Sequence, residues 1–389
     1  MRILLAISTY HQGAGYPRYG SEVARGLAAR GHDVTVLHRA GGPSAADAGI
    51  RFVRYRSIGP GKLLTMATEP LVLTRALRRL APTHDVAVSV GIPCRHDVVL
   101  IGLGTHAGYA RASWAATPVT SARGVLERVR PFHRVVMAWE RAMLTGTPPR
   151  SVVVGAARFA PEYPDIYGYP ADRVVVIPMG VDIDAFAPDD GRRARLRAEL
   201  GVGDAVPVLV SVANRARQKG LDVLVAALEG LHRRDPSRPW VAVFAGDGSD
   251  TAAMRSATAR LRDDGRVRLL GRVPDIRAVY CAADLTVFPS RYDPWGLVVT
   301  ESLACGTPVL VSPHAGASMA VEDGRNGAVL DDPSDPDALA TAIAAALDRD
   351  VGLDRAAVRA TVLPYTYAEG VARLDAHLQE AAVAARRTT

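Results

Sequence analysis

Residues 284–311 constrain the fold of this chain more than any other stretch. A short apolar run at Leu285–Phe288 leads into a loop broken by proline and glycine, and then into a helix predicted over about Leu297–Ala304. Gly306 and the Thr-Pro pair after it end that helix, and a second apolar run follows at once. Apolar runs of this length are typical of strands buried on both faces of a parallel sheet. The stretch therefore predicts a strand–helix–strand unit and an α/β fold.

Two carboxylates in this stretch are candidates for ligand contacts. Asp293 lies in the loop before the predicted helix, and Glu301 lies eight residues later, about one turn inside it. The amino-terminal end of a helix carries unpaired amide donors and partial positive charge, so it suits a phosphate, while carboxylates suit the hydroxyl groups of a ligand. The ordinary alternative is an Asp that caps the helix and a Glu on its solvated face. The spacing alone does not separate the two.

The same alternation of strands and helices continues through the second half of the chain. Apolar runs predict strands at 206–212, 241–245, 267–270, 285–288 and 309–311. The first of these strands leads into the basic loop 214–220, which contains Arg215 and Lys219. Cations beside a helix N-terminus make a suitable clamp for a diphosphate, because their charge adds to that of the helix end.

The first half opens as a Rossmann-like unit. An apolar run at 2–8 is followed by a glycine-rich turn at 11–20, by a helix with Val23, Leu27 and Ala28 on one face, and by a second strand. The glycines do not form a complete G-x-G-x-x-G pattern, and no acidic residue ends the second strand. A dinucleotide site, and with it a nicotinamide oxidoreductase, is therefore disfavoured.

A second glycine-rich stretch, at 97–114, follows a later apolar run. It contains Gly102, Gly104 and His106, a composition that lets the backbone approach a ligand closely and places an imidazole there. A structural loop histidine is the alternative. The next segment, 133–144, has the spacing of a packing helix, and its Trp139 and Met143 are predicted to lie in the core.

Composition narrows the class of protein. No run of about eighteen uncharged apolar residues predicts a membrane-spanning helix. Met1-Arg2 leads directly into the first strand, which argues against a signal peptide. The three cysteines, Cys94, Cys281 and Cys305, are widely spaced in apolar surroundings. They indicate buried reduced thiols in a cytoplasmic protein, and neither a disulfide framework nor a zinc site.

Positive charge is concentrated in the first half. Residues 1–182 hold 22 Lys and Arg against 12 Asp and Glu, or +10, and the rest holds 25 against 28, or −3, which together give the +7 of the whole chain. An anionic partner or a membrane surface would meet this half, with a solvated arginine-rich surface as the alternative. The helix predicted over 62–80 could rest on a membrane, although a crossover helix packed on the sheet is the simpler interpretation.

Several segments together resemble glycosyltransferase family 4, retaining enzymes of the GT-B fold. The main frame is DPWGLVVTESLACGTPVL at 293–310, where the family has two Glu residues with seven residues between them and this chain has Asp293 as the first. NRARQKG at 214–220 resembles the family's pyrophosphate loop, and VIPMGVD at 176–182 resembles its interdomain hinge. GLGTHAGYA at 102–110 is similar to the lipopolysaccharide glucosyltransferase I branch.

The resemblance implies roles for individual residues. Glu301 would bind the nucleotide ribose, Lys219 and Arg215 the pyrophosphate, and the catalytic residues His106 and Asp293 would lie at the donor sugar. Further donor-binding positions that it implies are Gly15, Val273, Trp295, Gly296 and Leu297. Asp293 itself departs from the family pattern, as do Asn214, where the family has Arg, and Met319, where Glu is common.

The resemblance also implies the architecture. We predict two Rossmann-like domains whose parallel sheets face each other across a cleft: an acceptor-side domain at 1–180 and a nucleotide-sugar-binding domain at 181–366. The helix at 367–389 is expected to return to the first domain. No metal or other cofactor is expected, because no His/Cys cluster offers ligands.

The predicted function is retaining transfer of a hexosyl unit from a nucleotide-diphosphate sugar, with UDP as the expected nucleotide. The acceptor would be a hydroxyl of a sugar-containing molecule, either a cell-envelope glycolipid or a glycosylated metabolite. No nucleic-acid partner is predicted, the expected location is cytoplasmic with possible peripheral membrane contact, and the oligomeric state is left open. Two alternatives remain: a GT-B sugar-nucleotide epimerase, and a sugar-nucleotide-binding protein with a weakened site, consistent with the three departures.

Overall fold

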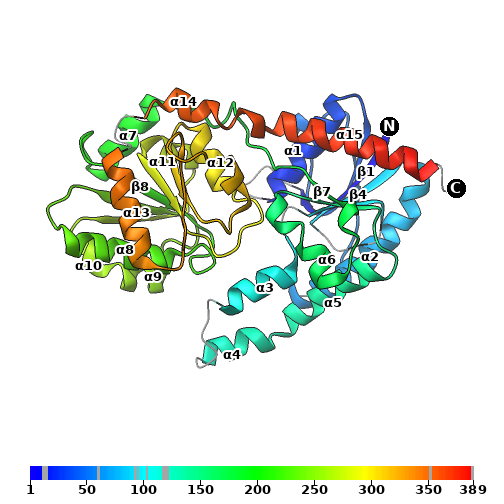
Figure 1. Cartoon of the computed structure of the whole chain (residues 1–389). Coiled ribbons are helices and arrows are strands. Elements are labelled where there is room, and N and C mark those ends of the chain that lie inside the picture. The colour runs from blue at the N-terminus through cyan, green and yellow to red at the C-terminus, as the bar shows by residue number, and fades with distance from the viewer. Residues whose placement is uncertain are drawn as a thin grey trace. The chain divides into compact units, whose positions relative to one another are not determined.

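The computed structural model describes residues 1–10, 16–58, 62–91, 94, 96–101, 104–115, 122–349 and 353–386 of the chain. It contains two compact units: one comprises Met1–Gly180 together with the segment from Tyr367 onward, and the other comprises Val181–Thr366. Each unit is built on one parallel sheet with helices on both of its faces (Figure 1). This is the doubly wound architecture that the alternating strands and helices predict.

The first unit has seven strands in the order β3-β2-β1-β4-β5-β6-β7, and every pair of neighbours is parallel. Its elements are β1 (Arg2–Tyr10), α1 (Tyr16–Ala29), β2 (Asp33–Gly41), β3 (Arg51–Arg54), α2 (Lys62–Leu80), β4 (Val86–Val90), β5 (Val98–Ile101), α3 (His106–Ala115), α4 (Ala122–Val129), α5 (Pro131–Thr145), β6 (Ser151–Val154), α6 (Glu162–Tyr167), β7 (Val174–Val176) and α15 (Tyr367–Arg386).

The second unit has six strands in the order β10-β9-β8-β11-β12-β13, again all parallel. Its elements are α7 (Asp190–Leu200), β8 (Val208–Val212), α8 (Leu221–Arg234), β9 (Val241–Ala245), α9 (Ala252–Ala257), α10 (Ala259–Asp263), β10 (Val267–Gly271), α11 (Ile276–Ala282), β11 (Leu285–Phe288), α12 (Leu297–Ala304), β12 (Val309–Val311), β13 (Gly327–Val329), α13 (Pro336–Arg349) and α14 (Arg355–Ala360).

Successive residues of β1 face opposite sides of the first sheet, as the two-residue repeat of a strand requires. Leu4 and Ala6 share a core with Leu73 and Leu77 of α2, so α2 is a packed crossover helix. On the other face, a Cβ at Gly20 of α1 would lie 3.1 Å from the Ile7 side chain, so the helix packs closely there.

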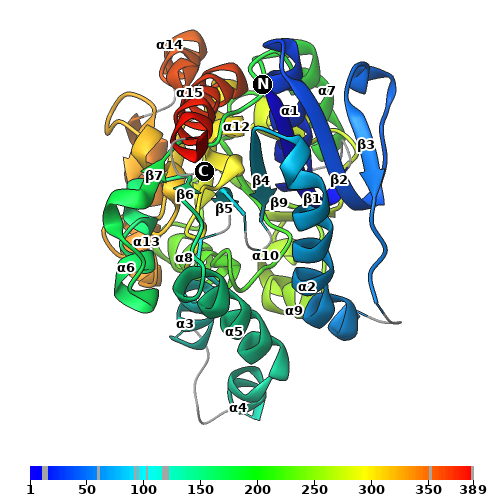
Figure 2. The same ribbon diagram turned by 90° about the vertical axis from the view of Figure 1, so that its right-hand side faces the viewer.

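The C-terminal helix α15 lies beside α1 in the first unit (Figure 2). A Cβ added at Gly26 of α1 would stand 2.8 Å from Val371 of α15, so a larger side chain would push the two helices apart. The prediction that the last helix returns to the first half of the chain is therefore confirmed.

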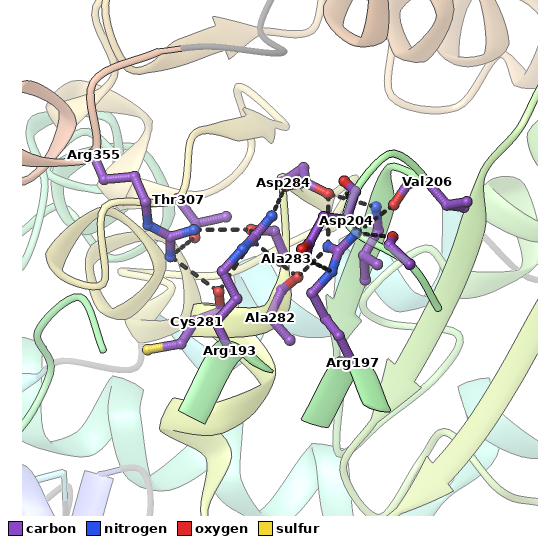
Figure 3. Close-up of polar contacts among 12 residues, drawn as sticks. Arg193, Arg197, Asp204, Val206, Cys281, Ala282, Ala283, Asp284, Thr307 and Arg355 are labelled. Carbon is purple, nitrogen blue, oxygen red and sulfur yellow. Dashed lines mark hydrogen bonds and ion pairs between the residues drawn. The ribbon is translucent and has the colours of Figure 1, made fainter. Parts of the chain in front are cut away.

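Helix α7 carries four arginines between residues 192 and 197, a composition typical of a solvated helix, but part of this charge is buried. Its Arg197 is only 1% exposed and donates hydrogen bonds to the carbonyl oxygens of Ala282 and Val206 and to the Asp284 carboxylate (Figure 3). Arg193 from the same helix binds Asp284 as well. These guanidinium groups pair with carbonyls at the C-terminal end of α11, where the helix dipole is negative. The local sequence pattern does not predict these tertiary contacts, which bury part of a charged helix face.

Other predictions need smaller corrections. The predicted glycine-rich turn at 11–20 is shorter, because α1 begins at Tyr16 and tolerates Pro17 in its first turn. Ala24 rather than Ala28 joins the buried face of that helix. The strands β3 and β13 were not predicted, and all three cysteines are buried as predicted. Among the described residues, no helix is both long and apolar enough to cross a membrane.

Candidate functional site

In the second unit, the strands that follow β8 in the sequence are first added on one side of it and then, from β11 onward, on the other side. β9 and β10 lie on one side of this pair, and β12 and β13 lie on the other. Ligands of open α/β sheets bind at such a switch point, beyond the carboxyl ends of the strands. The loops that leave β8 and β11 contain Lys219 and Asp293, and the structure brings these two side chains together.

Lys219 and Asp293 form an ion pair. The Lys219 Nζ lies 2.5 Å from Asp293 Oδ2, and the two side chains are 18% and 17% exposed. The ammonium also lies 5.4 Å from the centre of the Phe288 ring, a cation–π contact at the end of β11. The pair is therefore sheltered but still within reach of solvent, as a ligand site requires.

Two glycines give these loops their shape. Gly220 precedes α8 with φ +71°, and a Cβ there would stand 2.1 Å from the Pro289 carbonyl oxygen. Gly296 precedes α12 with φ +91°. Both backbone conformations are in the left-handed region that glycine adopts at little cost. A side chain at Gly220 would force the Lys219 loop away from the β11 loop.

The backbone around Asp293 is held by the loop after β12. The Asp293 amide donates to the His314 carbonyl at 3.0 Å, and the Asp293 carbonyl accepts from the Gly316 amide at 2.8 Å. The Asp293 carboxylate accepts from the Trp295 amide at 3.3 Å, and Trp295 itself is 1% exposed. One oxygen of Asp293 thus closes a short turn just before α12, while the other holds Lys219.

Glu301 lies further along α12 and is half-buried. Its Oε2 accepts a hydrogen bond from the hydroxyl of Tyr280 at 2.9 Å. Burial raises the pKa of Tyr280 well above its ordinary value, and the negative charge of Glu301 adds to the effect. Tyr280 therefore remains a protonated donor that orients the carboxylate. Tyr280 was not predicted as a site residue, because an apolar helix position gives no sign of a partner on another helix.

The other predicted donor residues lie around the same end of the second sheet or outside the described residues. Arg215 is exposed in the β8 loop, and its carbonyl accepts from the Lys219 amide at 3.1 Å. Val273 follows β10 and is half-buried, and Leu297 is the first residue of α12. Gly15 lies outside the described residues.

His106, predicted from the first half, is the first residue of α3. Two carboxylates hold the beginning of this helix: Glu140 accepts from the His106 amide at 2.6 Å, and Glu162 accepts from the Thr105 hydroxyl at 2.6 Å. The His106 ring meets a second imidazole, with its Nε2 2.9 Å from Nδ1 of His133. The first unit therefore builds a rigid support around the predicted histidine.

Glu140 is buried and accepts a hydrogen bond from the Tyr167 hydroxyl at 2.5 Å. Burial raises the pKa of Glu140 to about 7, and the bonds from Tyr167 and from the amides of His106 and Ala107 limit the rise. The carboxyl group that anchors α3 therefore changes its charge near neutral pH.

His133 and Glu140 belong to the segment that we predicted only as a packing helix. Met143 is in the core as expected, whereas Trp139 is only half-buried. The missed signal is a spacing: His133 and Glu140 are seven residues apart, which places both on one face of a helix. Polar residues recurring on an otherwise apolar face indicate partners elsewhere in the fold.

Comparison with known proteins supplies the family. A model described as Glycosyltransferase Family 4 matches residues 14–185, and one described as Glycosyl transferases group 1 matches residues 192–361. A GDP-mannose-dependent alpha-(1-6)-phosphatidylinositol monomannoside mannosyltransferase of Mycolicibacterium smegmatis is 31% identical over 318 residues, 77% of this chain and 75% of that protein. This chain belongs to glycosyltransferase family 4. It is therefore a transferase. This finding supports neither the epimerase alternative nor the binding-protein alternative.

Two further similarities bear on this member of family 4. A D-inositol 3-phosphate glycosyltransferase of Nocardia farcinica is 37% identical over 186 residues, so the aligned part spans 46% of this chain and only 41% of that protein. The crystal structure of WaaG, a glycosyltransferase involved in lipopolysaccharide biosynthesis, matches with a TM-score of 0.71 and 19% identity over 95% of this chain and 94% of that one. The second similarity confirms the GT-B fold.

In the parts of the family 4 chain that the structure describes, no three His, Cys, Asp or Glu side chains gather as metal ligands would. Metal-independent transfer stays a prediction, and the charges that would take the place of a metal are those of Lys219 and its loop.

Proposed function

We propose that this family 4 protein is a retaining hexosyltransferase that uses a nucleoside-diphosphate hexose. The observation that carries the proposal is the Lys219–Asp293 pair, held 2.5 Å apart at the switch point of the second sheet and beside the start of α12. A cation next to unpaired helix amides suits a diphosphate. The adjacent carboxylates suit hydroxyl groups of the sugar and the ribose.

In this proposal the donor diphosphate replaces Asp293 as the partner of Lys219. Cleavage of the sugar–diphosphate bond leaves additional negative charge on the diphosphate, and the Lys219 ammonium and the α12 amides stabilise that charge. Arg215, exposed in the same loop, supplies a second cation. Asp293, released from Lys219, then accepts hydrogen bonds from the donor sugar.

The remaining contacts follow the same logic. Glu301, oriented by Tyr280, accepts from the ribose hydroxyls, and main-chain groups near Val273 approach the base. His106 binds the sugar. Transfer with retention follows from attack on the same face of the sugar from which the diphosphate leaves, and we assign no side chain as a nucleophile on the opposite face.

We further propose UDP as the donor nucleotide and a sugar-containing acceptor that carries a negative charge. The mannosyltransferase relative uses GDP-mannose, so GDP is the nucleotide that an experiment must separate from UDP. The names of both relatives include an inositol bearing a phosphate, and residues 1–182 of this chain carry a net charge of +10 (22 − 12). A phosphate-bearing glycolipid or metabolite fits this charge.

The donor can be identified with a panel of UDP- and GDP-hexoses, scored first for thermal stabilisation and then for turnover with and without acceptor. Asp293→Asn should bind free UDP at least as tightly as the unaltered protein, because Lys219 loses its competing carboxylate, while turnover falls by about tenfold or more. Asp222→Asn, which removes a partner of Arg291 in the same unit, is the matched control and should change neither quantity. Weaker UDP binding by Asp293→Asn would show that the pair is structural.

Contact with an anionic lipid surface is proposed for helix α4. Val125, Leu126 and Val129 are 48%, 62% and 57% exposed, and Arg130 beside them is exposed too. The helix lies at the far end of the α3–α5 extension from the sheet of the first unit (Figures 1 and 2). Apolar side chains flanked by cations favour the interface of anionic membranes. Co-sedimentation with phosphatidylglycerol vesicles should be weakened by Leu126→Glu and by salt, and binding that Leu126→Glu does not change would contradict the proposal.

A further inference from the structure

Two imidazoles meet inside a cluster of aromatic rings in the first unit. The rings of Tyr109, Phe132 and Trp114 lie 5.3–6.3 Å from those of His106 or His133, centre to centre. His133 is only 4% exposed. A hydrogen bond in such buried surroundings is electrostatically stronger than in water, so the bond between His133 and His106 carries more weight there.

The geometry is that of a hydrogen bond between ring edges. The Nε2 of His106 and the Nδ1 of His133 are 2.9 Å apart, the ring centres are 5.1 Å apart, and the planes differ by 29°. The centre-to-centre distance exceeds the N···N distance by roughly the two ring radii, so the rings lie end to end in nearly one plane. A neutral imidazole has one N–H donor and one acceptor nitrogen, so one proton lies between the two rings.

The same helix also fixes the backbone of His106. Glu140, two turns after His133 on α5, accepts the His106 amide at 2.6 Å. α5 therefore holds His106 at two points, its amide through Glu140 and its ring through His133. With Nε2 bonded to His133, the edge of the His106 ring that includes Nδ1 faces away from His133.

We propose that His133 is a positioning residue for the donor sugar: it holds His106 by Nε2 and directs the Nδ1 edge of that ring toward a sugar hydroxyl. This inference rests on the proposed function. The proton between the rings couples the two ends of His106, because Nδ1 accepts from the sugar when Nε2 carries the proton and donates when it does not. A sugar hydroxyl can satisfy either arrangement.

The amides of Asn and Gln can test the role of His133, since the Asn amide reaches about as far as Nδ1 of histidine and the Gln amide about as far as Nε2. His133→Asn should keep most of the turnover, whereas His133→Gln should lower kcat about tenfold with little change in the Kd for UDP. His106→Ala should lower kcat at least as much. Adding His133→Gln to His106→Ala should cause no further loss, because the second residue acts only through the first.

Equal losses in His133→Asn and His133→Gln, or independent losses in the double variant, would overturn the inference and leave His133 as a core residue. Melting temperatures of the two single variants separate a loss of packing from a loss of positioning. The absence of turnover in the unaltered protein with every nucleotide sugar would overturn the proposed function and this inference with it. That result is visible before any variant is made, so the two failures are distinguishable.

Discussion

The two units place different chemistry at corresponding ends of their sheets. The second unit presents a charge pair, Lys219 and Asp293, sheltered but partly exposed. The first presents a pair of imidazoles, His106 and His133, within a cluster of aromatic rings. In the charge pair, the Lys219 ammonium can exchange the Asp293 carboxylate for another anion, such as a diphosphate. The hydrogen-bonded imidazole pair carries little charge, but it fixes the orientation of a donor or acceptor group. Under the proposed function, this difference means that the second unit holds the leaving group and the first orients a neutral sugar.

The means of support differ as well. In the second unit, glycines allow loops to approach each other, as Gly220 does against Pro289. In the first unit, side-chain carboxylates hold the helix that carries His106, through Glu140 and Glu162. Close contacts between backbone segments do not depend on pH, whereas a buried carboxyl group gains or loses a proton as the pH changes. The two units should therefore respond differently to substitution and to pH.

The largest effect is expected at Lys219. The chain has only two lysines among its 47 basic residues, Lys62 and Lys219. Lys219 places a compact ammonium between Asp293 and the Phe288 ring, and a planar guanidinium is wider and differently directed. Lys219→Arg should lose most of the steady-state turnover, whereas Lys62→Arg should be silent. Near-normal rates for Lys219→Arg would mean that charge alone suffices at this position and would weaken the contrast between the two units.

A smaller effect is expected at Glu301. The charge-assisted bonds that we propose between Glu301 and the ribose hydroxyls would be worth about 1.5–3 kcal/mol each, so Glu301→Ala should weaken donor binding by roughly tenfold or more. Tyr280→Phe removes only the orienting bond and should cost about threefold, from one neutral-to-charged hydrogen bond partly replaced by water. Isothermal titration with the free nucleoside diphosphate measures both. Unchanged affinity in Glu301→Ala would refute the ribose assignment.

The last effect concerns stability rather than activity and belongs to the first unit. The pKa of Glu140 is raised from 4.5 to about 7, so between these values the native state binds more protons than the unfolded chain. The free energy of unfolding should therefore fall as pH rises through this window, by at most about 3 kcal/mol from this group. Urea titrations at several pH values should show the decline, and Glu140→Gln should flatten it.

A variant with the opposite effect sharpens this test. Tyr167→Phe removes a hydrogen bond that lowers the pKa of Glu140, so the decline should extend to higher pH. If Glu140→Gln left the pH dependence unchanged, the carboxyl group would not be the source of it.

The sequence alone determined the architecture and the separate members of the candidate donor site. Short apolar runs between glycine and proline stops predicted β9, β11, β12 and α12 with the boundaries that the structure shows, because a strand buried on both faces has to be apolar at every position. The strands β3 and β13 escaped prediction, since four and three residues at the sheet edges carry too little pattern. Lys219 and Asp293 were each selected by type and by their place near a helix start.

Only the tertiary structure decided which side chains meet. Lys219 and Asp293 are 74 residues apart, and the parallel pairing of β8 with β11 is what joins their loops. By sequence, Arg197 has the pattern of a solvated charge, but in the structure it binds carbonyl groups of α11. His133 has the pattern of a core residue, but in the structure it bonds to His106 of α3. A residue type states what a side chain can donate or accept. Which partner it meets depends on which strands and helices lie side by side in the fold, and the local periodicity of the sequence does not specify this arrangement.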